Sequence, residues 1–120
     1  MGKSKRILIV DRDTDFACQL TNFLLAGGYS NIESVNSYRD ALISIRQNHF
    51  DIVLMDIFGP DMKGLDYAWE IKCLKPETKT FLMIEPEHQE LINGRIKEKV
   101  KFDCLTKSTI TKNLLGYLRG

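Results

Sequence analysis

The chain has 120 residues, of which 43% are hydrophobic and 28% are charged, and its formal net charge is +1. These values are typical of one globular domain with a core of its own. A net charge near zero gives no field that would draw the chain to nucleic acid or to an acidic membrane. No apolar run is long enough to span a bilayer. We therefore expect residues 1–120 to form a single domain that binds neither nucleic acid nor a membrane.

Short apolar runs alternate with helix-like segments along the whole chain. In chain order we predict a strand over 7–10, a helix between 13 and 27, a strand over 32–35, a helix from 38, a strand over 52–55, a helix over 65–74, a strand over 81–84, a short helix within 86–99, a strand over 102–105 and a helix after 109. Runs rich in Ile, Val and Leu suit strands that helices cover on both faces. Five such alternations predict an α/β fold with a right-handed, doubly wound parallel sheet.

Polar residues at two helix starts are predicted caps. Asp13 or Thr14 can cap the first helix, and Ser108 or Thr109 can cap the last. Within the third helix, Trp69 is most simply a packing residue.

Charged residues stand at the ends of the apolar runs. They are Asp11, Asp56, Glu85 and Lys107. In an open parallel sheet the carboxyl ends of the strands line one edge, where ligands bind. We therefore expect these four side chains to converge on one site.

The cysteines and histidines give no sign of a metal centre. Cys18, Cys73 and Cys104 are widely spaced, and no paired Cys/His spacing typical of structural zinc occurs. We interpret the three thiols as buried and unpaired, which suits a reducing cytoplasm. His49 and His88 are interpreted as surface residues.

Three segments together resemble the receiver domains of two-component response regulators. IVLMDIFGPDMKGLD resembles the phosphoacceptor segment, RILIVDRDTDF resembles the first strand and acidic corner, and FDCLTKS resembles the fifth strand with its Lys. The resemblance implies a flavodoxin-like sheet of five parallel strands in the order 2-1-3-4-5. It also implies that any output domain of such a regulator is absent or removed from residues 1–120.

The resemblance further implies a role in a phosphorelay. Asp56 would accept a phosphoryl group from a histidine kinase or phosphotransfer protein, and Lys107 would contact a phosphoryl oxygen. Mg²⁺ would be held by Asp11, Asp56 and the backbone carbonyl of Phe58. Homodimers through the last two helices and the fifth strand are common in the family. Such a cytoplasmic domain turns over no separate substrate, so we do not expect an enzyme.

The chain departs from the family pattern at three positions. Arg12 stands where a second acid usually contacts the metal, Glu85 where a Ser or Thr usually ends the fourth strand, and Cys104 where an aromatic residue is common. A charge pair 4 Å apart is worth roughly 4 kcal/mol at an effective dielectric constant of 20. We therefore expect Mg²⁺ binding to be weak or lost. Asp13 can replace the missing acid, although capping the helix is the commoner use of Asp there.

Two alternatives remain open at this point. In a pseudo-receiver, Arg12 and Lys107 would pair with the carboxylates of the site, and the fold would serve as an interaction module that needs no phosphorylation. Alternatively, the Asp-x-Asp pattern after the first strand resembles haloacid-dehalogenase-type phosphatases, with Asp11 as nucleophile and Asp13 as acid/base. Phosphorylation would map to Asp11 in a phosphatase and to Asp56 in a receiver.

Overall fold

The computed structural model describes residues 4–57, 63–88 and 102–119. All strands of its single sheet run parallel, in the order β2-β1-β3-β4-β5. They are β1 (Arg6–Val10), β2 (Asn31–Val35), β3 (Ile52–Asp56), β4 (Lys79–Ile84) and β5 (Asp103–Thr106). The predicted doubly wound α/β fold and its strand order are therefore confirmed.

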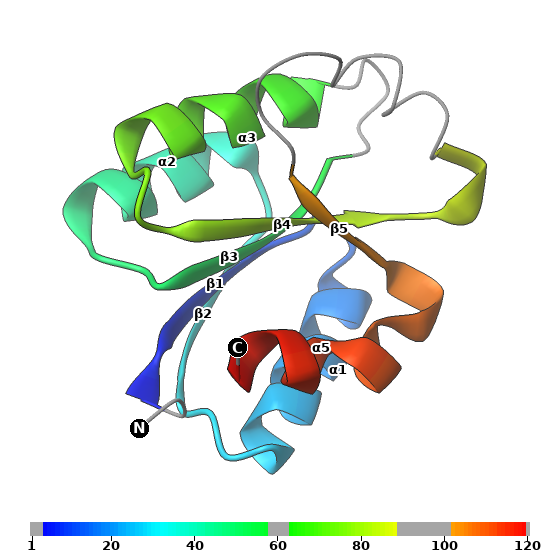
Figure 1. Cartoon of the computed structure of the whole chain (residues 1–120). Coiled ribbons are helices and arrows are strands. Elements are labelled where there is room, and N and C mark those ends of the chain that lie inside the picture. Colours follow the sequence, from blue (N-terminus) through cyan, green and yellow to red (C-terminus); the bar gives the residue numbers. More distant parts are fainter. Residues whose placement is uncertain (1–3, 58–62, 89–101, 120) are drawn as a thin grey trace.

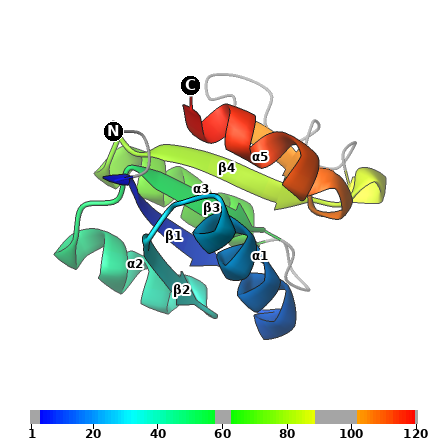
Figure 2. The same cartoon turned by 90° about the horizontal axis from the view of Figure 1, so that it is seen from below.

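Helices cover both faces of the sheet. They are α1 (Thr14–Ala26), α2 (Tyr38–Gln47), α3 (Lys63–Leu74) and α5 (Ile110–Arg119). Figure 1 shows α2 and α3 on one face and α1 and α5 on the other. Figure 2, turned by 90°, looks onto the face of the sheet that α1 and α5 cover.

The central strand β3 explains why two separate cores form. Val53 and Met55 pack in the cluster beneath α2 and α3, whereas Ile52 and Leu54 pack in the cluster beneath α1 and α5. Successive residues of a strand point to opposite faces, so a continuous apolar run serves both cores. The edge strand β2, by contrast, has no fully buried residue.

Of the two predicted helix caps, the structure confirms one and contradicts the other. The Asp13 carboxylate accepts a hydrogen bond from the Phe16 amide at 3.1 Å, so the predicted cap of α1 is confirmed. The predicted cap of the last helix is wrong. Ser108 and Thr109 lie inside a 3-10 turn, Lys107–Thr109, that directly precedes α5.

Several predicted core residues lie at the surface. Trp69 is 47% exposed because it follows the buried Ala68 and turns away from the core side of α3. Cys18 and Cys73 are exposed and Cys104 is half-buried, so the prediction of three buried thiols is wrong. The exposed cysteines lie on the solvent sides of α1 and α3.

The short helix predicted within residues 86–99 falls mostly outside the described residues. Its first part, Pro86–His88, forms a 3-10 turn. Among the described residues, no helix has both the length and the apolar composition to cross a bilayer.

Candidate functional site

The carboxyl ends of β1 and β3 place two aspartates beside each other. Asp11 follows β1, and its backbone amide donates to the Val35 carbonyl at 3.1 Å, which fixes its main chain against β2. Its side chain is fully buried. Asp56 is the last residue of β3, and its side chain is 11% exposed. Two carboxylates so little exposed need a compensating cation, since burying an unpaired charge is costly.

Lys107 supplies that cation from the end of β5. Its Nζ lies 2.9 Å from Asp11 Oδ2 and 3.7 Å from Asp56 Oδ2, and its side chain is 15% exposed. Burial acts to lower the pKa of Lys107, but the contact with Asp11 and the charges of Asp56, Asp11 and Asp13 outweigh it and raise the pKa above its ordinary value. Lys107 therefore stays protonated at neutral pH and draws the ends of three strands together.

An aromatic ring completes the surroundings of this ammonium. The Phe16 ring of α1 has its centroid 4.3 Å from Lys107 Nζ. A cation over an aromatic face is attracted by the ring quadrupole. No local signal in the sequence pairs Phe16 with a lysine that lies 91 positions further along the chain.

The backbone around Asp11 holds its carboxylate in one orientation. Oδ1 accepts a hydrogen bond from the Asp13 amide at 2.9 Å. Oδ2 is buried and faces the Lys107 ammonium, whose Nζ lies 2.9 Å away. Asp11 thus presents one buried oxygen to the site, while the Asp13 carboxylate is used in the helix cap.

These donors fit a small divalent cation only in part. Carboxylate oxygens are the donors that Mg²⁺ prefers, usually together with several waters. Asp11 and Asp56 offer such oxygens near one point. Phe58, whose carbonyl is the third expected ligand, lies outside the described residues. Within 4–57, 63–88 and 102–119, no group of three or more His, Cys, Asp or Glu side chains could hold a metal ion.

Neither of the two unusual charges takes part in the ion-paired cluster, which is formed by Lys107 with Asp11 and Asp56. Arg12 is exposed, and Glu85 is half-buried directly after β4. In the part of the chain that the structure describes, neither side chain takes part in an ion pair. The ion pairs expected of a pseudo-receiver are thus seen for Lys107 and not for Arg12. Cys104, which stands where the family commonly has an aromatic residue, is half-buried. Burial raises the pKa of its thiol, and the charge of Asp103 raises it to a smaller extent.

Known proteins share both this sequence pattern and this fold. The family model of the response regulator receiver domain matches residues 7–119. The transcriptional regulatory protein ZraR of Escherichia coli is 34% identical over an alignment of 116 residues, and the match covers 90% of this chain and 26% of ZraR. The chain therefore spans about a quarter of that relative's length. The chemotaxis protein CheY of Thermotoga maritima is 30% identical over 97 residues, which are 81% of each chain.

A solved structure extends the likeness to three dimensions. The response regulator protein TrrA of Thermotoga maritima, solved in complex with Mg²⁺ and BeF, superposes with a TM-score of 0.77 at 26% identity and covers 96% of each chain. The family match spans nearly the whole chain and includes Asp11, Asp56 and Lys107. This chain therefore belongs to the family of response-regulator receiver domains of two-component signalling.

Proposed function

We propose that this domain accepts a phosphoryl group on Asp56 from the phosphohistidine of a histidine kinase or phosphotransfer protein. The observation that supports the proposal most strongly is the single ammonium of Lys107 beside the carboxylates of both Asp56 and Asp11. The family's solved member with Mg²⁺ and BeF and the matching segments in a probable histidine kinase of rice and in the sensor kinase LuxN are consistent with it.

The chemistry follows from the charges of this cluster. A carboxylate oxygen of Asp56 forms a bond to phosphorus while the bond between phosphorus and the donor imidazole breaks, and the electron pair stays on the imidazole nitrogen. Attack by an anion on a charged phosphoryl group requires cations that offset the repulsion. Lys107, already 3.7 Å from Asp56, can contact a phosphoryl oxygen with little movement. Mg²⁺ held by Asp11 and Asp56 would offset further negative charge on the phosphoryl oxygens.

The dependence on Mg²⁺ is proposed to be weak. Lys107 already compensates the buried carboxylate of Asp11 at 2.9 Å, so a metal ion would have to share or displace that ammonium. Arg12 adds a positive charge where the family usually has an acid, and Glu85 adds a negative charge where the family has a hydroxyl. Both substitutions disfavour the usual arrangement of metal and phosphoryl group.

A small phosphodonor tests the proposal. The protein is incubated with acetyl phosphate, with and without Mg²⁺, and its intact mass is measured over time, with Asp56→Asn as the matched control. We expect slow addition of one phosphoryl group to the natural chain and none to the variant. An unmodified natural chain, under conditions that label an ordinary receiver, would reject the proposal.

The same experiment separates the two alternatives. The ion pairs of Lys107 with Asp11 and Asp56 are also compatible with a pseudo-receiver, an interaction module that needs no phosphorylation, which is the second candidate. Its signature is an unlabelled but folded protein. A label on Asp11 would instead support the haloacid-dehalogenase-type phosphatase with Asp13 as acid/base. We also propose that the domain turns over no separate substrate and that it is located in the cytoplasm.

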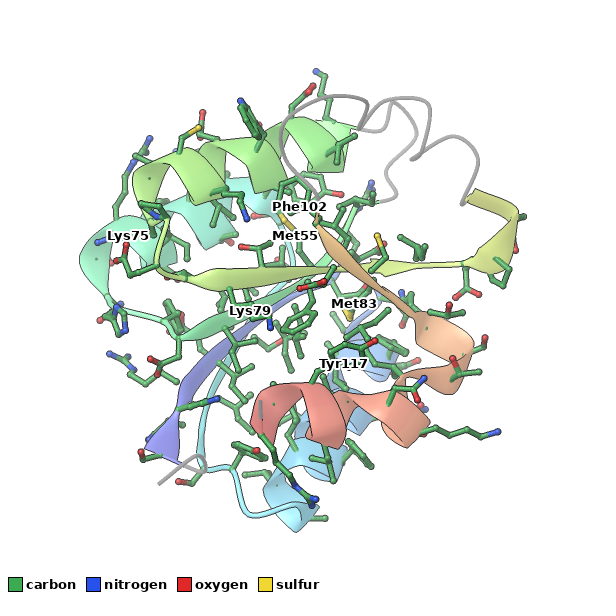
Figure 3. All side chains as sticks on the ribbon, in the orientation of Figure 1. Met55, Lys75, Lys79, Met83, Phe102 and Tyr117 are labelled. Carbon is green, nitrogen blue, oxygen red and sulfur yellow. The ribbon has the colours of Figure 1, made fainter. Side chains whose placement is uncertain are left out.

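The proposed homodimer surface is the face of the last two helices and the fifth strand, of which β5 and α5 belong to the described residues. Tyr117 of α5 is 45% exposed and meets the Phe81 ring edge-on at 5.6 Å. Lys79 lies over the same ring at 5.2 Å, and Figure 3 shows Lys79 on the side of β4 that faces α5. Exposed aromatic residues such as Tyr are enriched at protein interfaces. Sedimentation equilibrium of the natural chain and of Tyr117→Glu tests this surface.

A further inference from the structure

The backbone of Asp56 accepts a hydrogen bond from helix α2, which covers the face of the sheet opposite α1 and α5. The hydroxyl of Tyr38, the first residue of α2, donates a hydrogen bond to the Asp56 carbonyl oxygen at 3.0 Å. The Tyr38 side chain is half-buried. It belongs neither to the acidic corner nor to the ion-paired cluster, and no sequence pattern connects it with Asp56.

That carbonyl lies where the chain leaves the sheet. On the β1 side the ladder stops at the pair of Val10 with Met55, whereas on the β4 side it continues to the pair of Asp56 with Met83. Asp56 is thus the last residue of β3, held by one neighbouring strand only. A hydrogen bond to its carbonyl restrains the peptide group from which the carboxylate side chain departs.

The Tyr38 ring is itself held firmly in place. It stacks on the Tyr67 ring of α3, with centroids 5.0 Å apart and planes inclined by 23°. A Cβ on Gly64 would lie 2.4 Å from the Tyr38 hydroxyl oxygen and 2.4 Å from the Ile57 Cα. The hydroxyl therefore fills a space that exists only because residue 64 has no side chain. Helices α2 and α3 together fix this hydroxyl against the end of β3.

We propose that Tyr38 is a positioning residue for Asp56: its hydroxyl fixes the Asp56 peptide so that the carboxylate stays beside the Lys107 ammonium. The proposal rests on the proposed function of Asp56 as phosphoacceptor, and it adds a residue to that site. The carboxylate must be oriented in line with the bond that breaks, so a small misplacement slows the reaction. Tyr38 acts through the backbone and does not touch the phosphoryl group.

The test compares two variants that each lose one hydroxyl. Tyr38→Phe keeps the ring and its stacking but loses the hydrogen bond to Asp56. Tyr67→Phe is the matched control, because the Tyr67 hydroxyl makes no hydrogen bond among the described residues. Labelling by acetyl phosphate is followed by intact mass, and the ¹³C′ and ¹³Cγ resonances of Asp56 are followed by NMR. Both resonances are measured without any phosphodonor.

We expect Tyr38→Phe to label about two- to tenfold more slowly, which is the range for one net hydrogen bond. Both Asp56 resonances should move in Tyr38→Phe, and Tyr67→Phe should match the natural chain in rate and resonances. An unchanged ¹³C′ resonance, or a moved ¹³C′ with unchanged ¹³Cγ and unchanged rate, would overturn the positioning role. If the natural chain is not labelled at all, the proposed function fails, while the two resonances still decide whether Tyr38 orients the Asp56 carboxylate.

Discussion

Replacing Lys107 by Met removes the ammonium that both site carboxylates contact and keeps an apolar side chain of similar length. At an effective dielectric constant of 20, the gross attraction is about 6 kcal/mol for the 2.9 Å contact with Asp11 and about 4 kcal/mol for the 3.7 Å contact with Asp56. The cost of removing all three charged groups from water opposes most of this attraction. We expect a net loss of about 3 kcal/mol in the free energy of unfolding, because Asp11 is left buried and uncompensated.

Mg²⁺ should restore much of this loss. With the ammonium gone, the carboxylates of Asp11 and Asp56 can hold the cation without competition. A ligand present at about 100 times its dissociation constant stabilises the folded state by about 2.7 kcal/mol. The Lys107→Met variant should therefore gain more stability from Mg²⁺ than the natural chain does, whose own ammonium already occupies the space beside Asp11.

Urea unfolding in EDTA and in excess Mg²⁺ measures both effects. Lys79→Met is the matched control, because Lys79 pairs with Asp103 at 3.9 Å with both side chains at least half exposed. Such surface pairs contribute at most about 1 kcal/mol and should show no response to Mg²⁺. The reasoning is refuted if Lys107→Met is as stable as Lys79→Met in EDTA, or if Mg²⁺ stabilises it no more than the natural chain.

Three further changes test other parts of the account. Phe16→Leu should lower the free energy of unfolding by about 1 kcal/mol. In a double-mutant cycle, the same change should have a much smaller effect in the Lys107→Met background, where the ammonium is absent; additive effects would argue against the cation–π contact. Arg12→Asp combined with Glu85→Thr should raise Mg²⁺ affinity and the labelling rate roughly tenfold, since it restores an acid and a hydroxyl; calorimetry that finds the affinity unaltered would disprove the charge argument. Asp51 accepts a hydrogen bond from the backbone amide at the start of β1, and this contact, aided by His49, lowers its pKa from 3.8. The contribution of Asp51 to stability is complete above its ordinary pKa and is lost as the pH falls through its lowered pKa. Asp51→Asn should therefore flatten the fall in stability from about pH 5 to about pH 2. Urea midpoints of the variant that fall as steeply as those of the natural chain would contradict this.

The sheet and the ion-paired cluster were predictable because they depend on short, strong patterns. Each buried strand is an unbroken apolar run, and the charged residue after the run marks the edge where ligands bind. The topology of a parallel sheet then brings Asp11, Asp56 and Lys107 to one edge whatever separates them in the chain. Asp13 was predictable as a cap for a similar reason, since capping depends on residues three positions apart.

The contacts that the sequence missed join residues with no local relation. Phe16 meets Lys107 and Tyr38 meets Asp56 only because helices pack across the ends of strands, and neither pair has a characteristic spacing. Trp69 is exposed although its side chain is large and apolar, because the neighbouring Ala68 takes the core side of α3. The last helix begins at Ile110, as predicted, but a 3-10 turn over Lys107–Thr109 precedes it, so Ser108 and Thr109 do not act as its caps.

The most direct measurement is the position of the label after reaction with acetyl phosphate. Borohydride reduces an aspartyl phosphate to homoserine, so peptide mass spectrometry identifies the residue that carried the phosphoryl group. Homoserine at position 56 is the expected result, with the chemotaxis protein CheY of Thermotoga maritima treated in parallel as the positive control. Homoserine at position 11, or none while the control is labelled, would contradict the assignment of Asp56 as phosphoacceptor.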